Sequence, residues 1–100
     1  MFYVGIVSKT KDDTLRFIEV KGRQAGSSTV TVTHNEMITA ANKPDDTYLA
    51  VVEVDGNKRR VTYYLHWNEQ PPGFADINHT IHLDRLRQIA DVVLEREIEA

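Results

Sequence analysis

The sequence predicts an α+β fold, a mixed β-sheet of about five strands with helices packed against it. Short runs rich in β-branched and aromatic residues recur between polar turns over the first two thirds of the chain. A threonine followed three positions later by a glutamate marks the start of one helix, and spaced apolar residues near the end indicate another. The expected order is strand, strand, strand, helix, strand, strand, loop, helix, which is typical of α+β proteins.

The composition fits one domain spanning residues 1–100, with 41% hydrophobic residues. A net charge of −3 argues against coating nucleic acid by bulk charge and leaves room for a local basic patch. The absence of cysteine excludes a disulfide framework and a thiolate metal site. No apolar run reaches the length of a membrane helix, and the start, MFYVGIV, lacks a signal-peptide signature. We therefore expect a cytoplasmic protein with no membrane partner, and, because it starts directly on an apolar strand, a fragment of a larger one.

Two β-hairpins are expected. The first joins strands at 2–7 and 15–21 across the polar turn KTKDDT. The second joins a mostly apolar central strand at 48–54 to the run RRVTYYLHW through the turn DGNK.

The strand at 15–21 carries the pattern E-x-K. Side chains alternate between the faces of a strand, so Glu19 and Lys21 share one face. Ile18 and Val20 point to the other face, where we expect a helix to cover them. A metal-dependent nuclease uses an oxygen ligand beside a cation in this way. An ordinary half-exposed strand also accommodates such a pair, and the run VEVDG repeats the rhythm of IEVKG with an acid in place of the lysine.

A helix is expected at 34–42, after the alternating strand TVTVT at 29–33. Thr33 can cap this helix while Glu36 reaches back to the Thr33 backbone. Capping alone predicts that Glu36→Gln costs little stability, whereas a large loss would indicate a charged role. The two roles can coexist.

A second amphipathic helix is expected after the loop NEQPPGF. Its charged end, EREIEA, is expected to fray. The helical spacing is carried by Leu83, Leu86, Ile89, Ala90 and Val93.

The runs RFIEVKGR and TVTVTHNEMITAANKPDDTYLAVVEVDG resemble the domain family named after the C-terminus of the plant protein NO VEIN. That family also occurs at the ends of bacterial helicase-like and restriction-associated proteins. The resemblance covers roughly residues 7–56 and extends more loosely into the final helix. Its strongest points are IEVKG, the helix start at Thr33, Asn35 and Glu36, and the strand that begins at Tyr48.

That family in turn is similar to the PD-(D/E)XK nuclease superfamily, which implies a restriction-endonuclease-like core, here without the usual first helix. Glu19 and Lys21 match the E-x-K positions and would be catalytic, with Glu19 as a ligand of Mg²⁺ and Glu36 in support. The expected first aspartate is absent, because Gly5 stands in its place. Asp12 and Asp13 lie nearby, in the predicted turn.

The resemblance therefore implies a nuclease-fold accessory domain of a nucleic-acid-processing or defence protein, with a partial metal-dependent phosphodiesterase site. DNA and parent-protein domains such as a helicase would be its partners. The alternative is a non-catalytic module that retains the fold and binds protein or DNA. Because one of the expected acids is missing, we expect the chain to cleave DNA poorly or not at all. Whether the chain is an enzyme stays open.

Three further groups of residues have two interpretations each. Basic residues at the second hairpin and on the E-x-K strand can contact a phosphate backbone, or they are solvated charges; they are Lys21, Arg23, Lys58, Arg59 and Arg60. Four histidines can bind metal, although solvent exposure is the expected state; they are His34, His66, His79 and His82. Three aromatic residues can stack on bases, although a core role is expected; they are Tyr63, Tyr64 and Trp67.

Overall fold

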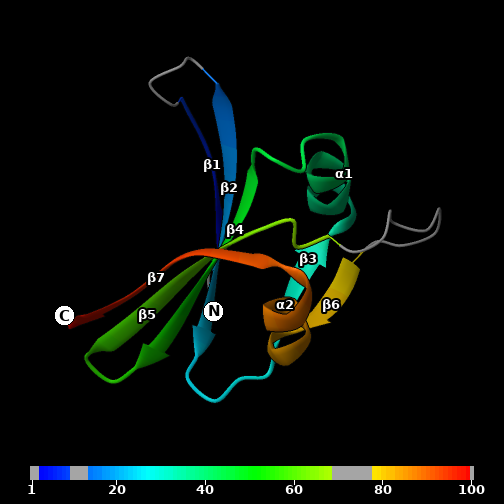
Figure 1. Cartoon of the computed structure of the whole chain (residues 1–100). Helices are drawn as coiled ribbons and strands as arrows, with labels where there is room; N and C mark the ends of the chain where they lie inside the picture. Colours follow the sequence, from blue (N-terminus) through cyan, green and yellow to red (C-terminus); the bar gives the residue numbers. More distant parts are fainter. Residues whose placement is uncertain (1–2, 10–13, 69–77, 100) are drawn as a thin grey trace.

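The computed structural model of the chain describes residues 3–9, 14–68 and 78–99, and confirms an α+β fold (Figure 1). A five-stranded sheet has the order β1-β2-β4-β5-β7, and β3 and β6 form a separate two-stranded sheet. The elements are β1 (Tyr3–Lys9), β2 (Leu15–Gln24), β3 (Thr29–Thr33), α1 (His34–Asn42), β4 (Thr47–Asp55), β5 (Lys58–Leu65), β6 (Asn78–His82), α2 (Leu83–Ile89) and β7 (Asp91–Glu99).

Both expected hairpins are confirmed. β1 pairs antiparallel with β2, and β4 pairs antiparallel with β5. The second turn contains Gly56 at a φ of 58°, a backbone conformation that glycine adopts without the steric cost of a side chain. The sequence DGNK therefore ends one strand and starts the next where the local chemistry predicts it.

A crossover through β3 and α1 makes the central pair of the sheet parallel. β2 and β4 run parallel in the register Glu19↔Leu49 and Lys21↔Val51. α1 has the expected bounds, 34–42, and follows directly on β3. β3 is a strand as predicted but pairs with β6 instead of joining the main sheet, because its alternating valines face the core from the opposite side.

The C-terminal part of the chain differs from the sequence-based prediction. α2 ends at Ile89, and the segment expected to be helix through Val93 and then to fray is the strand β7. A strand, β6, also precedes α2, between the expected loop NEQPPGF and the expected helix start, where no strand was predicted. The helical spacing of apolar residues continues past Ala90, but pairing with β5 decides the structure, because β-branched residues are well suited to a sheet.

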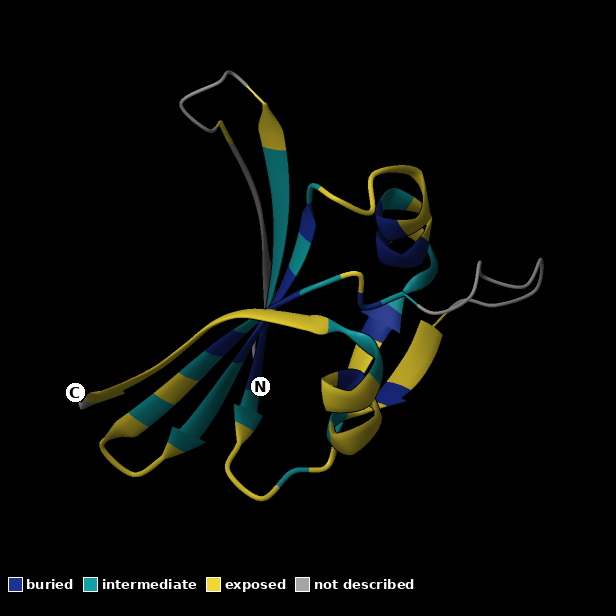
Figure 2. Cartoon of the chain, viewed as in Figure 1, coloured by how far each residue is buried: buried dark blue, intermediate teal, exposed yellow. Residues whose placement is uncertain are grey.

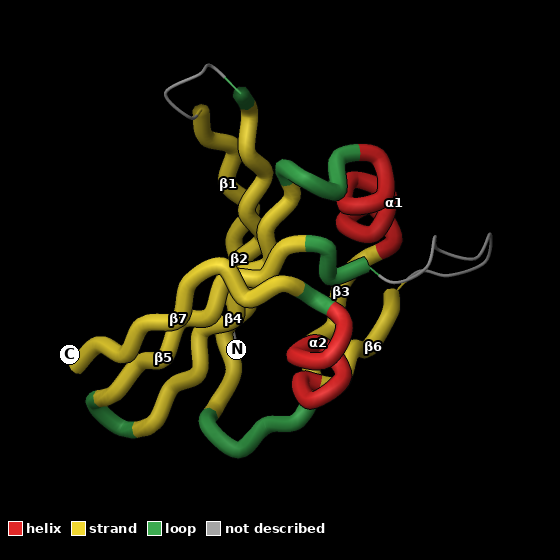
Figure 3. Tube along the Cα trace, in the orientation of Figure 1, coloured by secondary structure: helices red, strands yellow, loops and turns green. Residues whose placement is uncertain are grey.

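The core lies between the main sheet and a layer made of α1, α2 and the β3–β6 pair. Figures 1 and 3 show this layer on one side of the sheet. Each element of the layer, the strands β4 and β5 and the segment just after β5 contribute buried apolar side chains. These are Val30, Val32, Met37, Ala40, Leu49, Val51, Tyr64, Trp67, Ile81 and Leu86.

The two faces of β2 are the reverse of the expected ones. Glu19 and Lys21 share the face of Leu49 and Val51, so they point toward α1 and the core. Ile18 and Val20 point to the face that carries neither described helix, and both are half-buried. Period-two alternation shows which side chains of β2 share a face, but it does not show which face meets the core. One face of β2 is apolar and the charges of the other pair with each other and with Glu36, so either face can be buried.

Candidate functional site

The E-x-K lysine is buried in an ion pair. The Lys21 ammonium donates to both oxygens of Glu36, at 2.9 Å to Oε1 and 3.0 Å to Oε2. Both side chains are only 8% exposed. β2 supplies Lys21 and the first turn of α1 supplies Glu36, so this pair attaches the helix to the sheet. The sequence predicted Glu36 near the site but gave no sign that it would be the partner of Lys21.

Glu36 also completes the helix cap. The Thr33 backbone N–H donates to Glu36 Oε1 at 2.7 Å, and the Glu36 backbone N–H donates to Thr33 Oγ1 at 3.2 Å. The capping box is therefore present as predicted. One carboxylate thus accepts hydrogen bonds from a strand lysine and from the backbone at its own helix start, so the capping and charged roles coexist.

The third member of the cluster is Glu19. Its burial, the hydrogen bond between its carboxyl and that of Glu36, and the charge of Glu36 raise the pKa of Glu19 to about 7, and Lys21 only partly offsets this. Burial also favours the protonated form of Glu36, but hydrogen bonds from Glu19, Thr33 and Lys21 outweigh it and keep the pKa of Glu36 below its usual value. The two carboxyl groups beside one ammonium therefore differ: Glu36 is ionised, and a large fraction of Glu19 is protonated near neutral pH.

Gly5 lies directly opposite Glu19 in the β1–β2 ladder. This is the position where the nuclease resemblance places an aspartate, and a glycine there adds no carboxylate. Asp12 and Asp13, the alternative acids in the sequence, lie outside the described residues.

These residues do not fit a magnesium ion as they are arranged. A hard cation needs ionised oxygen ligands with open lone pairs. Glu36 already accepts from Lys21 and Thr33, and the pKa of Glu19, raised to about 7, leaves a large fraction of its carboxyl group protonated at neutral pH. Within the ranges 3–9, 14–68 and 78–99, no group of three or more His, Asp or Glu side chains is arranged to hold a metal.

The proposed nucleic-acid contacts are dispersed. Lys21 is buried, whereas Lys58 and Arg60 share the core-side face of the second hairpin and Arg59 lies on the opposite face. Glu53 stands between Arg23 and Arg60 on neighbouring strands. The basic residues are therefore interleaved with acids and divided between two faces, which weakens a continuous phosphate-binding stripe.

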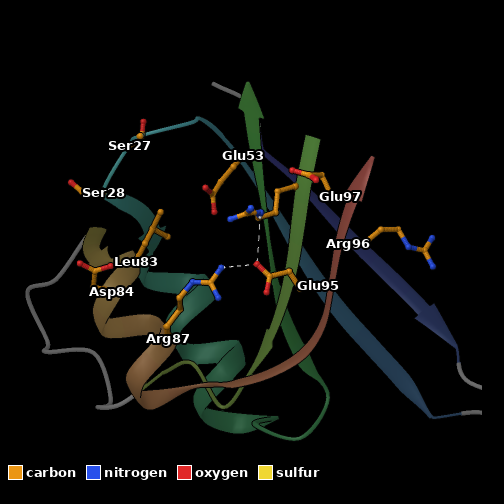
Figure 4. Close-up of a pocket in the computed structure, with 11 residues that line it drawn as sticks. Ser27, Ser28, Glu53, Leu83, Asp84, Arg87, Glu95, Arg96 and Glu97 are labelled. Atoms are coloured by element: carbon orange, nitrogen blue, oxygen red, sulfur yellow. Dashed lines mark hydrogen bonds and ion pairs between the residues drawn. The ribbon is translucent and has the colours of Figure 1, made fainter. Parts of the chain in front are cut away.

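A groove of about 810 Å³ lies between the connection after β2, the helix α2 and the strands β5 and β7. Figure 4 shows Glu53, Arg87 and Glu95 pointing toward one another across it. Arg87 Nη2 donates to Glu95 Oε1 at 2.8 Å, and this bond lowers the pKa of Glu95. Arg60 Nε lies 3.9 Å from the same oxygen. The charges of the groove are largely mutually paired, and sequence analysis missed them because β7 was expected to be helix.

His66 forms a second polar cluster that sequence analysis did not find. Its Nδ1 lies 2.7 Å from Asp91 Oδ2, and its Nε2 lies 2.7 Å from Asp45 Oδ1. The hydrogen bonds with Asp45 and then with Asp91 raise the pKa of His66, because both ring nitrogens donate only in the imidazolium. This histidine has a φ of 54° and connects the α1–β4 loop to the start of β7.

The other histidines and the aromatic residues largely follow expectation. His79 and His82 are exposed on β6, and His34 is half-buried. Tyr64 and Trp67 are buried in the core, where Trp67 Nε1 donates to the Thr47 carbonyl at 3.2 Å. The three histidines named here belong to no metal-ligand group within the described ranges, and two of the three aromatic residues serve packing.

Comparisons with known proteins give one match. The family model described as "Protein NO VEIN, C-terminal" matches residues 5–64, which begin within β1, include β2, the whole crossover through β3 and α1, and β4, and end one residue before the end of β5. No curated protein and no solved structure gives a significant match. In the part of the chain that the structure describes, neither helix is both long and apolar enough to span a membrane.

Proposed function

Because the chain belongs to the family of the NO VEIN C-terminal domain, we propose that it is a non-catalytic interaction domain of a larger protein. In this proposal its E-x-K residues hold the fold together instead of cleaving phosphodiester bonds. The observation that carries the proposal is the buried pair in which Lys21 donates to both oxygens of Glu36.

A catalytic lysine has to reach a substrate phosphate. Moving Lys21 out of its position would leave the Glu36 carboxylate buried without its cation, and removing one partner of such a pair typically costs about 3–5 kcal/mol. Glu19 is also poorly suited to bind a metal ion, because its pKa of about 7 leaves a large fraction of it protonated at neutral pH. The three side chains therefore stabilise one another in the folded chain, and this supports a structural role.

The proposal is tested by cleavage assays on the purified chain. Labelled single-stranded and double-stranded DNA and RNA are incubated with Mg²⁺ or Mn²⁺ at neutral and alkaline pH. We expect no cleavage above that given by Glu19→Gln, which keeps the size of the side chain and cannot ionise. Metal-dependent cleavage that Glu19→Gln abolishes would overturn the proposal, and cleavage that persists in the variant would indicate a contaminating nuclease.

A metal-dependent phosphodiesterase is the second candidate. The observation that favours it is the convergence of Glu19, Glu36 and Lys21 beside Gly5, the position at which a resemblance to PD-(D/E)XK nucleases would require an aspartate. An activity on DNA within a nucleic-acid-processing or defence protein, beside a helicase domain, would follow from this candidate. Its test is whether an acid introduced at Gly5 creates metal binding, as described in the Discussion.

A further inference from the structure

The sheet face opposite the two helices is apolar across four strands. One row of register partners crosses it as Val20, Ala50, Tyr63 and Leu94. The next row contains Val52 and Val61, which are both half-buried. Leu94 and Ile98 on β7 are 46% and 45% exposed, and Figure 2 shows β7 exposed along its length.

Among the described residues both helices and the β3–β6 pair lie on the other face, as Figure 1 shows. The sheet is mixed, with one parallel pair, β2–β4, and three antiparallel pairs, so its topology alone does not require a cover on this face. The apolar residues that cross four strands are what mark this face as a docking surface.

The charged residues on this face indicate the charge of the partner that would bind it. Its described charged residues are three arginines, Arg16, Arg59 and Arg96, and one acid, Asp91, which is paired with His66. Figure 4 shows Arg96 pointing away from the groove on the other side of β7. Among the described residues, Arg59 and Arg96 thus give the part of this face that β5 and β7 form an excess of positive charge, in a chain whose net charge is −3.

We infer that this face docks an amphipathic helix of a partner protein, in which acidic residues flank an apolar stripe. The stripe would cover the row from Val20 to Leu94, and the acidic residues would lie near Arg59 and Arg96. A second copy of the chain fits less well, because two such faces would bring arginines of one copy near those of the other. The inference rests on the proposed function as an interaction domain and names the surface and the partner.

The test uses two synthetic helical peptides of about 18 residues, or five turns. Both carry the same leucine stripe, which is flanked by glutamates in one and by lysines in the other. Binding to the intact chain is followed by fluorescence anisotropy at low and high salt. We expect the glutamate peptide to bind at least about tenfold more tightly than the lysine peptide, and this difference to shrink at high salt.

Variants locate the site. Leu94→Lys should weaken binding of the glutamate peptide, whereas Ile38→Lys, at an apolar position of similar exposure on α1, should not. The double variant Arg59→Glu/Arg96→Glu should reverse the preference toward the lysine peptide, whereas Arg85→Glu on α2 should leave it unchanged.

Equal binding of the two peptides, binding of neither, or equal effects of Leu94→Lys and Ile38→Lys would each overturn the inference. A dimer seen by sedimentation that Leu94→Lys dissociates would overturn it in favour of a second copy. None of these results bears on cleavage, so the loss of this inference and the loss of the proposed non-catalytic function are observed in separate experiments.

Discussion

The Lys21 ammonium lies 2.9 Å and 3.0 Å from the two carboxylate oxygens of Glu36, and the two side chains are 8% exposed. These residues are 15 positions apart in the chain and belong to the strand β2 and the helix α1. Desolvation offsets much of the attraction in such a pair, so the pair matters most when one partner is missing.

Lys21→Met should destabilise the fold by about 3–5 kcal/mol, because Glu36 would remain buried as a carboxylate without its cation. Urea unfolding at neutral pH measures this loss. Lys43→Met is the matched control, since Lys43 is exposed at the end of α1, and it should change the free energy of unfolding by less than about 0.5 kcal/mol.

The double variant Lys21→Met/Glu36→Met removes both charges together. It should recover a large part of the stability that Lys21→Met loses, because no charge is then left buried. If the double variant instead loses as much stability as Lys21→Met and Glu36→Met lose together, the ion pair is not the cause of the destabilisation.

Thr33→Ala should cost about 0.5–2 kcal/mol, because it removes the acceptor of the Glu36 backbone N–H at the helix start. Glu36→Gln should cost more than Thr33→Ala. Glutamine can still accept from the Thr33 amide, but it puts a neutral amide in place of the carboxylate that accepts both hydrogen bonds of the buried Lys21 ammonium. Thermal denaturation of both variants shows which one loses more stability. Equal losses, or a larger loss for Thr33→Ala, would indicate that Glu36 acts only as a helix cap.

The stability of the chain should fall as the pH rises from 4.5 through about 7. The pKa of Glu19 is raised from 4.5 to about 7 in the folded chain, so the folded state holds this proton more tightly than the unfolded state. Its contribution is complete below pH 4.5 and is lost as the pH passes 7. The pKa of Glu36 is lowered, so its contribution is lost only as the pH falls below 4.5.

Urea unfolding at a series of pH values measures this slope, and Glu19→Gln should flatten it because glutamine does not ionise. A wild-type slope that Glu19→Gln leaves unchanged would mean that Glu19 titrates normally.

His66→Asn should flatten a separate, smaller slope at higher pH. The raised pKa of His66 means that its contribution is present below 6.5 and is lost as the pH rises through its folded pKa. His66 and both aspartates are largely exposed, so the effect should stay below about 1 kcal/mol and shrink with salt. Asparagine tolerates the positive φ of this position, which makes it a conservative replacement.

Gly5→Asp should raise the affinity for Mn²⁺ or Mg²⁺, because it places a carboxylate opposite Glu19 in the β1–β2 ladder. Calorimetry on the variant and the unaltered chain measures the change. Ser8→Asp, on the same strand but opposite Arg16, is the matched control and should add no comparable affinity. Equal binding by the two variants would remove support for the phosphodiesterase candidate.

The local sequence determined much of the fold. The turn DGNK between two apolar runs specified one hairpin, and KTKDDT specified the other, because their turn residues and strand propensities agree. Thr33 and Glu36 fixed the start of α1 through a cap that needs only a four-residue segment. The E-x-K spacing also placed Glu19 and Lys21 on one face, which follows from the geometry of any strand.

Only the tertiary structure decided which face of β2 meets the helices, what Lys21 pairs with, and that residues 91–99 form a strand. Each depends on a partner distant in sequence: Lys21 on Glu36, Glu19 on the carboxyl beside it, and β7 on β5. A lysine becomes a buried structural cation or a free catalytic one according to the charge that folding brings to it. Spacing along one strand carries no information about that charge.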